Sequence, residues 1–447
     1  MRFERVFLIH PATTPQLPEY PPVGLGYLGE VLRQHRIAHT VMDMRLGHDG
    51  SALHAKIADF QPDLIGVSLV TLLHARAYTL LRDIKAQFPH VAIVAGGPHV
   101  STYRAEALRQ SPAIDFGVTM EGEHALLDLC RGADPSGIPG VLSRQGGTIH
   151  YAGDRPYLTD LDGLGFPRYE GFELGRYPAG DIALLTSRGC PYACIFCAAQ
   201  TVIGRRFRFR GVRSVADEIA YWAGRGKRRF SIIDDNFTLR RERVIALCDE
   251  LEARGLTGLE FRCPNGIRAD RCDRELLERM RGAGFTYVAF GVESGSERVL
   301  QRINKGETLD EIRRSTQLAC DLGFDVGLFF IVGAPGETWD DLEASVHLAL
   351  EYPVADAKFF SLIPLPGTEL YRWVNEHGYF VTPPEEYLND PTHWQNDARW
   401  DQRPVFATPE LPLGRRVEAL AYVSDVQRTI RDRAVARKAD GAGTAGA

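Results

Sequence analysis

The sequence predicts an α/β fold: an N-terminal doubly wound, Rossmann-like domain, a partial (β/α)6 barrel of the TIM type, and a small C-terminal region. Short apolar runs alternate with helical patterns through residues 1–130, and six further strand–helix units follow over residues 181–370. Residues 131–180 between them are rich in Gly, Pro and Asp, which marks a boundary. A chain of 447 residues, 44% of them hydrophobic, can build more than one core.

The first domain, residues 1–130, is expected to contain a parallel sheet covered on both faces. Continuous apolar runs that alternate with helices are typical of such sheets, and their ligands bind at the carboxyl ends of the strands. The expected strands span 6–11, 39–44, 63–70, 91–97 and 115–120, and the expected helices 26–36, 51–60, 75–88 and 123–130.

Residues 131–180 are predicted to be a linker with a small hairpin at 141–153. The partial barrel is predicted over residues 181–370, with its site at the C-terminal strand ends. Residues 371–447 form a less regular C-terminal region, and the composition of the tail at 436–447 predicts disorder. The barrel strands are expected at 182–187, 229–234, 258–263, 286–292, 325–333 and 357–364, with helices between them.

Composition narrows the cellular setting. The 52 basic and 58 acidic residues give a net charge of −6, so the whole chain has no electrostatic footprint for nucleic acid. No apolar run reaches the length of about 18 residues that a transmembrane helix needs. The N-terminal apolar stretch is too short for a signal peptide. We therefore expect a cytoplasmic protein without a membrane span.

Three of the eight cysteines carry the strongest motif. Cys190, Cys194 and Cys197 follow the first barrel strand with the spacing C-x3-C-x2-C. Such clustering in a chain without an export signal favours a metal over disulfides. Three thiolates on one loop can bind three irons of a 4Fe–4S cluster and leave the fourth open to a small chelating substrate. A zinc site is the alternative, but it needs a fourth Cys or His nearby, and none follows within a turn.

This loop resembles the signature of the radical S-adenosylmethionine (SAM) superfamily, and the resemblance extends over residues 180–370. It implies that the open iron binds SAM and that one electron, from a reductant of the flavodoxin or ferredoxin type, cleaves SAM to a 5′-deoxyadenosyl radical. Carboxylates after the second strand suit the SAM ammonium group. The residues implied to bind SAM are Phe196, which would also shield the cluster, Asp234, Asp235, Glu293, Ser294, Gly333 and Pro335.

The first domain resembles the cobalamin-binding domains that precede the barrel in some radical SAM enzymes. The matching stretches are residues 21–33, 63–71 and 95–99. The resemblance implies a cobalamin whose nucleotide tail runs between the strand-end loops. The residues implied to contact it are His10, Asp43, Ser68, Thr71, Gly96, Gly97 and Glu121.

One departure concerns the lower face of the cobalt. Domains that coordinate cobalt from below carry Asp-x-His-x-x-Gly, whereas Arg45 stands here two residues after Asp43. An imidazole ligand from that position is therefore excluded. The change is compatible with radical methylation and also with a domain that no longer binds cobalamin.

Together the resemblances imply a cobalamin-dependent radical SAM enzyme that methylates an unactivated carbon of a small-molecule or peptide substrate through a 5′-deoxyadenosyl radical and methylcobalamin. One alternative is a cyclase or ring-rearranging enzyme without methyl transfer, and another is a sensor without turnover. A third is a tRNA-modifying methylthiotransferase, which the basic stretches 204–211 and 225–230 would suit. Those relatives carry three further N-terminal cysteines, and residues 1–129 contain none, so nucleic acid is not the expected partner.

Overall fold

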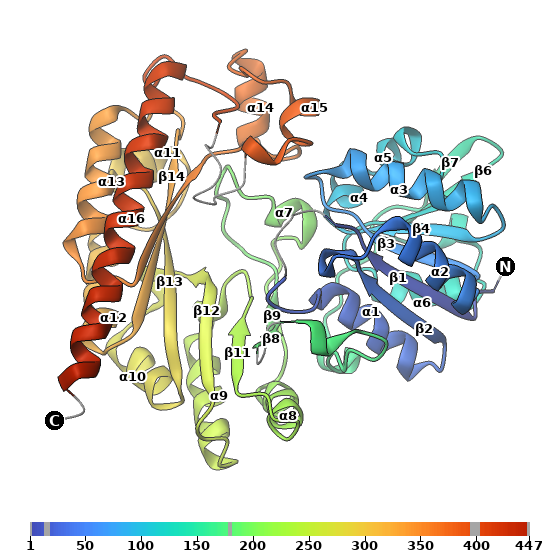
Figure 1. Ribbon diagram of the computed structural model, residues 1–447, viewed down its shortest axis with the longest axis horizontal. Helices are drawn as coiled ribbons and strands as arrows, with labels where there is room; N and C mark the ends of the chain where they lie inside the picture. Colours follow the sequence, from blue (N-terminus) through green and yellow to red (C-terminus); the bar gives the residue numbers. More distant parts are fainter. Residues whose placement is uncertain (1, 13–17, 178–180, 394–402, 445–447) are drawn as a thin grey trace. The chain divides into compact units, whose positions relative to one another are not determined.

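The computed structural model describes residues 2–12, 18–177, 181–393 and 403–444. The chain divides into two compact units (Figure 1). The first comprises Met1–Ala183, Ala199–Gly204 and Arg208–Ser214, and the second comprises Leu184–Ala198, Arg205–Phe207 and Val215–Ala447. In the part of the chain that the structure describes, no helix is long and apolar enough to cross a membrane.

The first unit contains a seven-stranded sheet in the order β2-β1-β3-β4-β5-β6-β7. The first five strands pair in parallel, and the order 2-1-3-4-5 is one of the two common doubly wound arrangements. The predicted strands of residues 1–130 are therefore confirmed. They are β1 (Arg5–His10), β2 (Ala38–Asp43), β3 (Leu64–Ser68), β4 (Ala92–Gly96) and β5 (Phe116–Val118).

Helices cover both faces of this sheet, as its apolar strands require. One buried cluster joins Leu53 and Ile57 of α2 with Leu81 of α3, and the opposite cluster joins Leu32 of α1 with Leu126 of α6. Two short helices after β4 were not expected from the sequence. The helices are α1 (Val23–Gln34), α2 (Gly50–Phe60), α3 (His74–Gln87), α4 (Pro98–Tyr103), α5 (Ala105–Gln110) and α6 (Glu123–Cys130).

The prediction that residues 131–180 form a linker is wrong for the hairpin within this segment, because the hairpin belongs to the first sheet. Strands β6 (Val141–Gln145) and β7 (Thr148–Tyr151) form the expected hairpin, but β6 pairs antiparallel with β5 and extends the first sheet. Strand β5 has only three residues, and the hairpin removes the exposed edge that it would otherwise present. The segment after the hairpin also packs on the first unit, because a Cβ at Gly26 would lie 2.6 Å from Tyr169.

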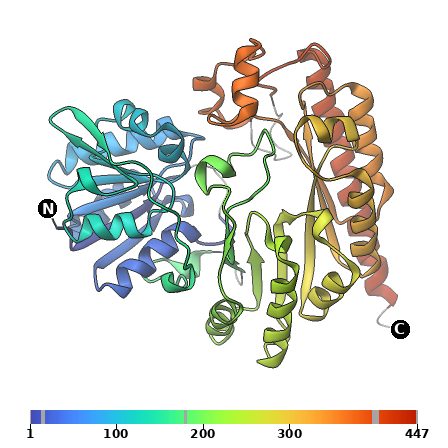
Figure 2. The same ribbon diagram turned by 180° about the vertical axis from the view of Figure 1, so that it is seen from behind.

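The second unit is built on a six-stranded sheet in the order β15-β14-β13-β12-β11-β8, which confirms the six predicted barrel strands. Strands β11 to β15 pair in parallel. Figures 1 and 2 show a curved, open sheet with helices along its outer face. The strands are β8 (Asp181–Leu184), β11 (Arg229–Ile232), β12 (Glu260–Ile267), β13 (Phe285–Glu293), β14 (Asp325–Val332) and β15 (Asp356–Ser361).

Helices follow the barrel strands in the predicted order. Between β8 and α8 lie three short elements, β9 (Ser187–Arg188), α7 (Ala199–Val202) and β10 (Arg208–Phe209). Two short helices, α14 and α15, follow β15 in the C-terminal region. The helices are α8 (Val212–Ala223), α9 (Arg241–Ala253), α10 (Arg274–Gly282), α11 (Glu297–Arg302), α12 (Leu309–Asp321), α13 (Trp339–Glu351), α14 (Glu369–Glu376) and α15 (Pro384–Tyr387).

The prediction of a disordered tail at 436–447 is wrong up to residue 444. Helix α16 (Leu413–Thr444) runs through most of it, and residues 445–447 lie outside the described residues. Alanine is the strongest helix former, and two basic side chains fix the helix to the sheet. Arg437 donates to the Val354 carbonyl at 2.6 Å, and Lys438 forms an ion pair with Asp325 at 2.8 Å.

Candidate functional site

The three clustered cysteines lie on one loop after β8 and β9, and none of the three forms a disulfide. The loop is held on both sides of Cys194. The Ile195 amide donates to the Ile303 carbonyl at 3.1 Å, and the Asn304 side chain donates to the Ala193 carbonyl at 2.9 Å. The loop conformation is therefore fixed by the chain after α11 before any cofactor binds.

The donor set of this loop fits a cluster with several irons. Among the described residues, no three His, Cys, Asp or Glu side chains converge as they would around a single metal ion. A cubane presents separate irons, so each thiolate of a loop can take its own. Burial raises the pKa of the Cys190 and Cys194 thiols, so the thiolates form when metal displaces their protons. Residues Cys190, Cys194 and Cys197 would hold the cluster.

The two aspartates after β11 have different surroundings. Asp234 is buried, and its carboxylate accepts hydrogen bonds of 2.6 Å from the Thr186 amide, the Thr186 hydroxyl and the Ser187 hydroxyl. Asp235 keeps an exposed side chain. Desolvation by the protein around it, together with the charge of Asp234, raises the pKa of Asp235 to about 6. Asp234 therefore holds the start of the cysteine loop, and a SAM contact by Asp235 stays a prediction.

The fourth barrel strand ends in a strained carboxylate. Glu293 adopts a positive φ of 67°, and the pairing of β13 with β14 is irregular between Gly291 and Glu293. Such backbone strain in a non-glycine residue is frequent at functional sites. Ser294 next to it is fully buried, and its hydroxyl lies 3.4 Å from that of Ser345. Ser294 therefore packs inside the protein, and a ligand contact by Glu293 stays a prediction.

The loop after β14 contains Gly333 and Pro335, both buried. Glu337 accepts hydrogen bonds from the Gly333 and Ala334 amides, and Arg416 of α16 donates to the Gly333 carbonyl at 2.9 Å. Burial raises the pKa of Glu337 to about 7 and lowers that of Arg416 to about 10. The backbone groups of Gly333 are therefore held by the protein itself, and this fixes the shape of the loop.

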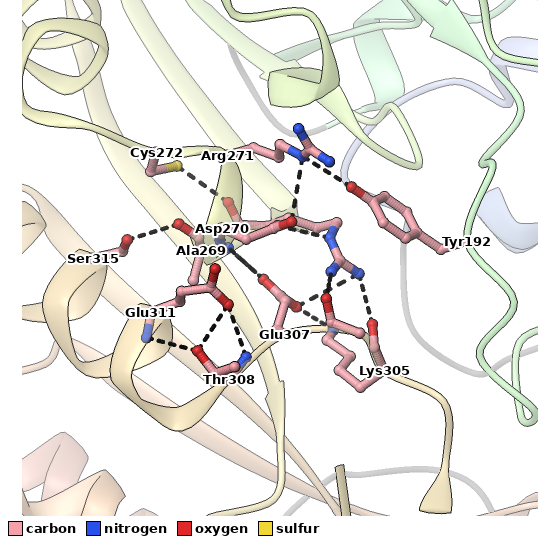
Figure 3. A network of polar contacts seen from close by, with 12 residues as sticks. Tyr192, Ala269, Asp270, Arg271, Cys272, Lys305, Glu307, Thr308, Glu311 and Ser315 are labelled. Carbon is pink, nitrogen blue, oxygen red and sulfur yellow. Dashed lines mark hydrogen bonds and ion pairs between the residues drawn. The ribbon is translucent and has the colours of Figure 1, made fainter. Parts of the chain in front are cut away.

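A buried polar network beside the cysteine loop was missed by sequence reasoning (Figure 3). Lys305 forms ion pairs with Glu293 at 3.0 Å and with Glu307 at 3.2 Å. The Arg268 guanidinium lies 3.5 Å from the ring centroid of Tyr192, in the cysteine loop. No sequence signal marks Lys305, because its ion pair with Glu293 depends on how the irregular end of β13 folds against this segment.

The carboxyl edge of the first sheet brings His10 and Asp43 together at the ends of β1 and β2. Asp43 accepts hydrogen bonds from the Arg45 guanidinium at 2.9 and 2.7 Å and from the Tyr177 hydroxyl at 2.9 Å. Burial alone would raise the pKa of Asp43, but Arg45 and Tyr177 hold it below its ordinary value. Burial, assisted by Arg45, lowers the pKa of His10.

The loops after β3 and β4 fit a ligand that approaches closely. Ser68 pairs in register with Gly96, and Thr71 follows in the same loop. Gly97 has a φ of 95°, and a Cβ there would lie 2.8 Å from the Leu69 carbonyl, so the fold itself requires this glycine. A Cβ at Gly96 would make only ordinary contacts, the nearest at 3.6 Å. The missing side chain at Gly96 therefore suits a ligand, as the cobalamin tail requires.

Glu121 is already engaged by the protein. Its carboxylate binds Arg208 at 2.6 Å and the Leu158 amide at 2.9 Å. Arg210 is buried and donates to the Tyr27 hydroxyl at 3.3 Å. The basic stretch 204–211 thus places two of its arginines inside the first unit, which favours the structural interpretation over an RNA contact. A cobalamin contact by Glu121 stays a prediction.

The loop after β4 contributes to a cluster of aromatic rings that was not predicted from the sequence. His99 is fully buried and stacks on His74, with ring centroids 4.7 Å apart. The Tyr78 hydroxyl lies 2.6 Å from Nε2 of His99. Burial lowers the pKa of His99 to about 3, so this imidazole is neutral. The ring cluster stiffens the strand ends next to Gly96 and Gly97.

Comparisons with known proteins agree with both halves. Residues 184–349 match the model of the Radical SAM superfamily, and residues 13–130 match that of the B12 binding domain. An uncharacterized methyltransferase of Pyrococcus horikoshii is 28% identical, covering 86% of this chain and 85% of its own. An anaerobic magnesium-protoporphyrin IX monomethyl ester cyclase of Rubrivivax gelatinosus is also 28% identical, covering 85% and 73%.

A solved structure shares the fold over nearly the whole chain. It is the radical S-adenosylmethionine methyltransferase TsrM of Kitasatospora setae, solved with its tryptophan substrate and a SAM analogue. The TM-score is 0.76 at 21% identity, and the match covers 95% of this chain and 89% of that one. The predicted order of a cobalamin-binding-like domain and a radical SAM barrel is confirmed at the level of the fold.

Proposed function

Because this chain joins a B12-binding domain to a radical SAM domain, we propose that it is a cobalamin-dependent radical SAM methyltransferase acting on an unactivated carbon. The observation that carries the proposal is the arrangement in the second unit. Three cysteines on one loop, none of them in a disulfide, are accompanied by Asp235 and Glu293 at the ends of two strands of the same sheet. Similarity to named methyltransferases and to the fold of TsrM supports methyl transfer.

The chain's own residues have separable roles in this proposal. Cys190, Cys194 and Cys197 hold the cluster, and Phe196 shields it. Asp235 binds the ammonium group of SAM by a charge-assisted hydrogen bond, and Glu293 binds its ribose or methionine part. Gly333 and Pro335 shape the wall for the adenosine. When bound, the cluster and SAM supply a 5′-deoxyadenosyl radical, and cobalamin supplies the methyl group.

In the first unit, Ser68 and Thr71 offer hydroxyls, and Gly96 offers space to the cobalamin tail. His10 and Asp43 lie at the neighbouring strand ends. Asp43 holds Arg45 at the position where other cobalamin domains carry the ligating histidine. If cobalamin binds here, this position would offer it no imidazole, and the cobalamin would supply the methyl group.

The proposed enzyme has a substrate class, an electron donor and a cellular location. The substrate is a small molecule or a peptide, and an external flavodoxin- or ferredoxin-type protein delivers the electron. We place the enzyme in the cytoplasm, where thiols stay reduced.

The decisive experiment follows the methyl group. Anaerobically reconstituted protein is incubated with cobalamin, a low-potential reductant, candidate substrates and SAM carrying a deuterated methyl group. Release of 5′-deoxyadenosine together with a product that has gained the labelled methyl group supports the proposal. Release of 5′-deoxyadenosine with a rearranged product of unchanged carbon count supports the second candidate instead.

That second candidate is a cyclase or ring-rearranging enzyme with the same cofactors. The specific observation in its favour is the 28% identity to the Rubrivivax gelatinosus cyclase over 410 residues. The mass of the product separates the two reactions, because only methylation adds a methyl group.

A further inference from the structure

The segment between α11 and α12 connects the cysteine loop to Glu293. Three consecutive residues, Ile303 to Lys305, take part. The Ile303 carbonyl and the Asn304 side chain hold the backbone on either side of Cys194, at 3.1 and 2.9 Å. The next residue, Lys305, points to the end of β13 and binds Glu293 at 3.0 Å. One short segment therefore fixes both a cluster thiol and a ligand carboxylate.

Lys305 is a buried charge with two carboxylate partners. Its side chain is 8% exposed, and those of Glu293 and Glu307 are 12% and 1% exposed. Burial disfavours its charged form, but Glu293 and Glu307 outweigh this and raise the pKa of Lys305, with a further contribution from Cys194. The ammonium group is therefore permanently charged, and breaking such a buried pair is costly.

The backbone around Lys305 is held as firmly as its side chain. The Arg268 guanidinium donates to the Lys305 carbonyl at 2.9 Å and to the Gly306 carbonyl at 2.7 Å. Glu307 accepts a hydrogen bond of 2.6 Å from the Ala269 amide. Figure 3 shows these groups converging beside Tyr192 of the cysteine loop. Lys305 has little freedom to choose another partner.

Gly291 provides the space for the ion pair. A Cβ at this position would lie 2.8 Å from Oε1 of Glu293 and 3.0 Å from Nζ of Lys305. The backbone of Gly291 lies outside the left-handed region, so conformation does not require glycine here. The absence of a side chain is explained by the pair itself.

From this geometry we infer that Lys305 is a positioning residue that sets Glu293 relative to the cysteine loop, and so couples SAM binding to the cluster. The inference rests on the proposed function, in which Glu293 binds SAM. Lys305 itself does not need to touch SAM. It neutralises the carboxylate and fixes its direction, so that binding costs less reorganisation.

The test compares variants of the full-length protein, reconstituted anaerobically with iron and sulfide. For each variant, the iron content, the dissociation constant of SAM and the SAM-induced change in the electron paramagnetic resonance spectrum of the reduced cluster are measured. Lys305→Met should retain the iron of the wild type but bind SAM about tenfold more weakly, because Glu293 loses the charge-assisted hydrogen bond that fixes its direction. The spectral response to SAM should shrink with it.

Five further variants make the test specific. Gly291→Ala keeps every charge but fills the space of the pair, so it should act in the same direction as Lys305→Met. Lys305→Arg should recover part of the affinity. Lys305→Met should have no additional effect in a Glu293→Gln background. Lys85→Met is the matched control, because Lys85 forms an ion pair with Asp115 at 2.7 Å in the first unit and should leave SAM binding unchanged.

The outcomes are distinguishable. If the wild type holds a cluster but binds no SAM, the proposed function fails. If the wild type binds SAM and both Lys305→Met and Gly291→Ala bind it equally well, the inference fails alone. Additive effects of Lys305→Met and Glu293→Gln would overturn it too. If Lys305→Met does not retain iron, the SAM affinities of Gly291→Ala and Lys305→Arg test the inference instead, and wild-type affinity in both would overturn it.

Discussion

Adjacent aspartates at the end of β11 show how position separates two residues that look alike in the sequence. Asp234 is 1% exposed and holds three hydrogen-bond donors of the cysteine loop, whereas Asp235 lies exposed next to it. Desolvation, together with the charge of Asp234, raises the pKa of Asp235, so a cationic ligand would favour the charged form of this carboxylate. A structural carboxylate thus prepares a ligand-binding one.

Substitution should separate the two roles. Asp234→Asn should destabilise the protein without cofactors by about 2 kcal/mol, because the amide replaces one acceptor oxygen with a donor that faces buried donors. Asp235→Asn should leave that stability within about 0.5 kcal/mol, as surface substitutions do. It should weaken SAM binding. Chemical denaturation and equilibrium dialysis measure the two quantities. A stable Asp234→Asn variant with unchanged cysteine-loop chemistry would contradict the assignment.

The cysteines allow a matched comparison. Cys194→Ala should lose the cluster, with its iron and its visible absorption, because two thiolates do not hold a cubane. Cys248→Ala is the control, since Cys248 is buried in α9 and burial raises the pKa of its thiol to about 12. It should retain the iron and lose about 1 kcal/mol of stability from lost packing. Equal iron content in both variants would refute the cluster assignment.

At the scale of single residues, the sequence indicated those candidates that belong to motifs of neighbouring positions. The three thiols stand within eight positions, and the strand-end carboxylates follow apolar runs directly. Lys305 and Arg416 were missed because their significance depends on contacts formed only in the fold. Arg416 meets Gly333, which is 83 positions away, and a lone basic residue in a helix carries no such signal.

At the scale of elements, α16 contributes to the loop after β14. It supplies Arg416, which is fully buried, lies 4.1 Å from the ring centroid of Phe406 and holds the Gly333 carbonyl. Arg416→Met should loosen the loop after β14 and reduce affinity for SAM more than it reduces iron content. The control Arg415→Met removes an exposed arginine one residue away. Equal effects of the two variants on SAM binding would argue against a role for the loop.

Glu337 in the same loop predicts a pH dependence. Burial raises its pKa from 4.5 to about 7, so between these values the folded state binds the proton more tightly than the unfolded state. Stability should therefore fall as pH rises through this window, by up to about 1.4 kcal/mol per unit of pKa difference. Glu337→Gln should remove this part of the dependence. Urea unfolding of the protein without cofactors between pH 4.5 and 7 tests it, and identical profiles would contradict it.

Element prediction succeeded where periodicity is strong. The parallel strands and most helices of both sheets follow from apolar runs and helical patterns. In the structure, α12 also begins with a capping box formed by Thr308 and Glu311. The hairpin β6–β7 was found, but its pairing with β5 was not, because pairing partners are not encoded locally. Helix α16 was not predicted, and one reason is that its last turns resemble a low-complexity tail.

At the scale of the whole molecule, each unit gathers its candidate side chains at the carboxyl ends of a parallel sheet. In the first unit, the strand order reverses between β1 and β3. The carboxyl ends of the strands at such a point are the usual binding position of doubly wound folds. In the second unit, the carboxyl edge of the sheet carries the cysteine loop. The order of the two domains was predictable from sequence, whereas substrate identity depends on side chains that no motif marks.

A larger side chain at Gly96 tests whether cobalamin binds to the first unit. Gly96→Val should lower the bound cobalamin, because a side chain would enter space that the fold leaves open, while the nearest protein atom is 3.6 Å from the added Cβ. Iron content and stability should stay near those of the wild type. Gly50→Val is the control, since nothing lies within 4 Å of a Cβ there. Unchanged cobalamin in Gly96→Val would place the ligand elsewhere.

The visible absorption spectrum of the full-length protein, produced anaerobically with cobalamin supplied and analysed for iron, sulfide, zinc and cobalt, tests the central claim most directly. We predict broad iron–sulfur absorption that dithionite bleaches, corrin bands in the same sample, and about four irons and one cobalt per chain. A colourless protein that carries zinc on its cysteines, or one whose three thiols are oxidised to disulfides, would contradict the account.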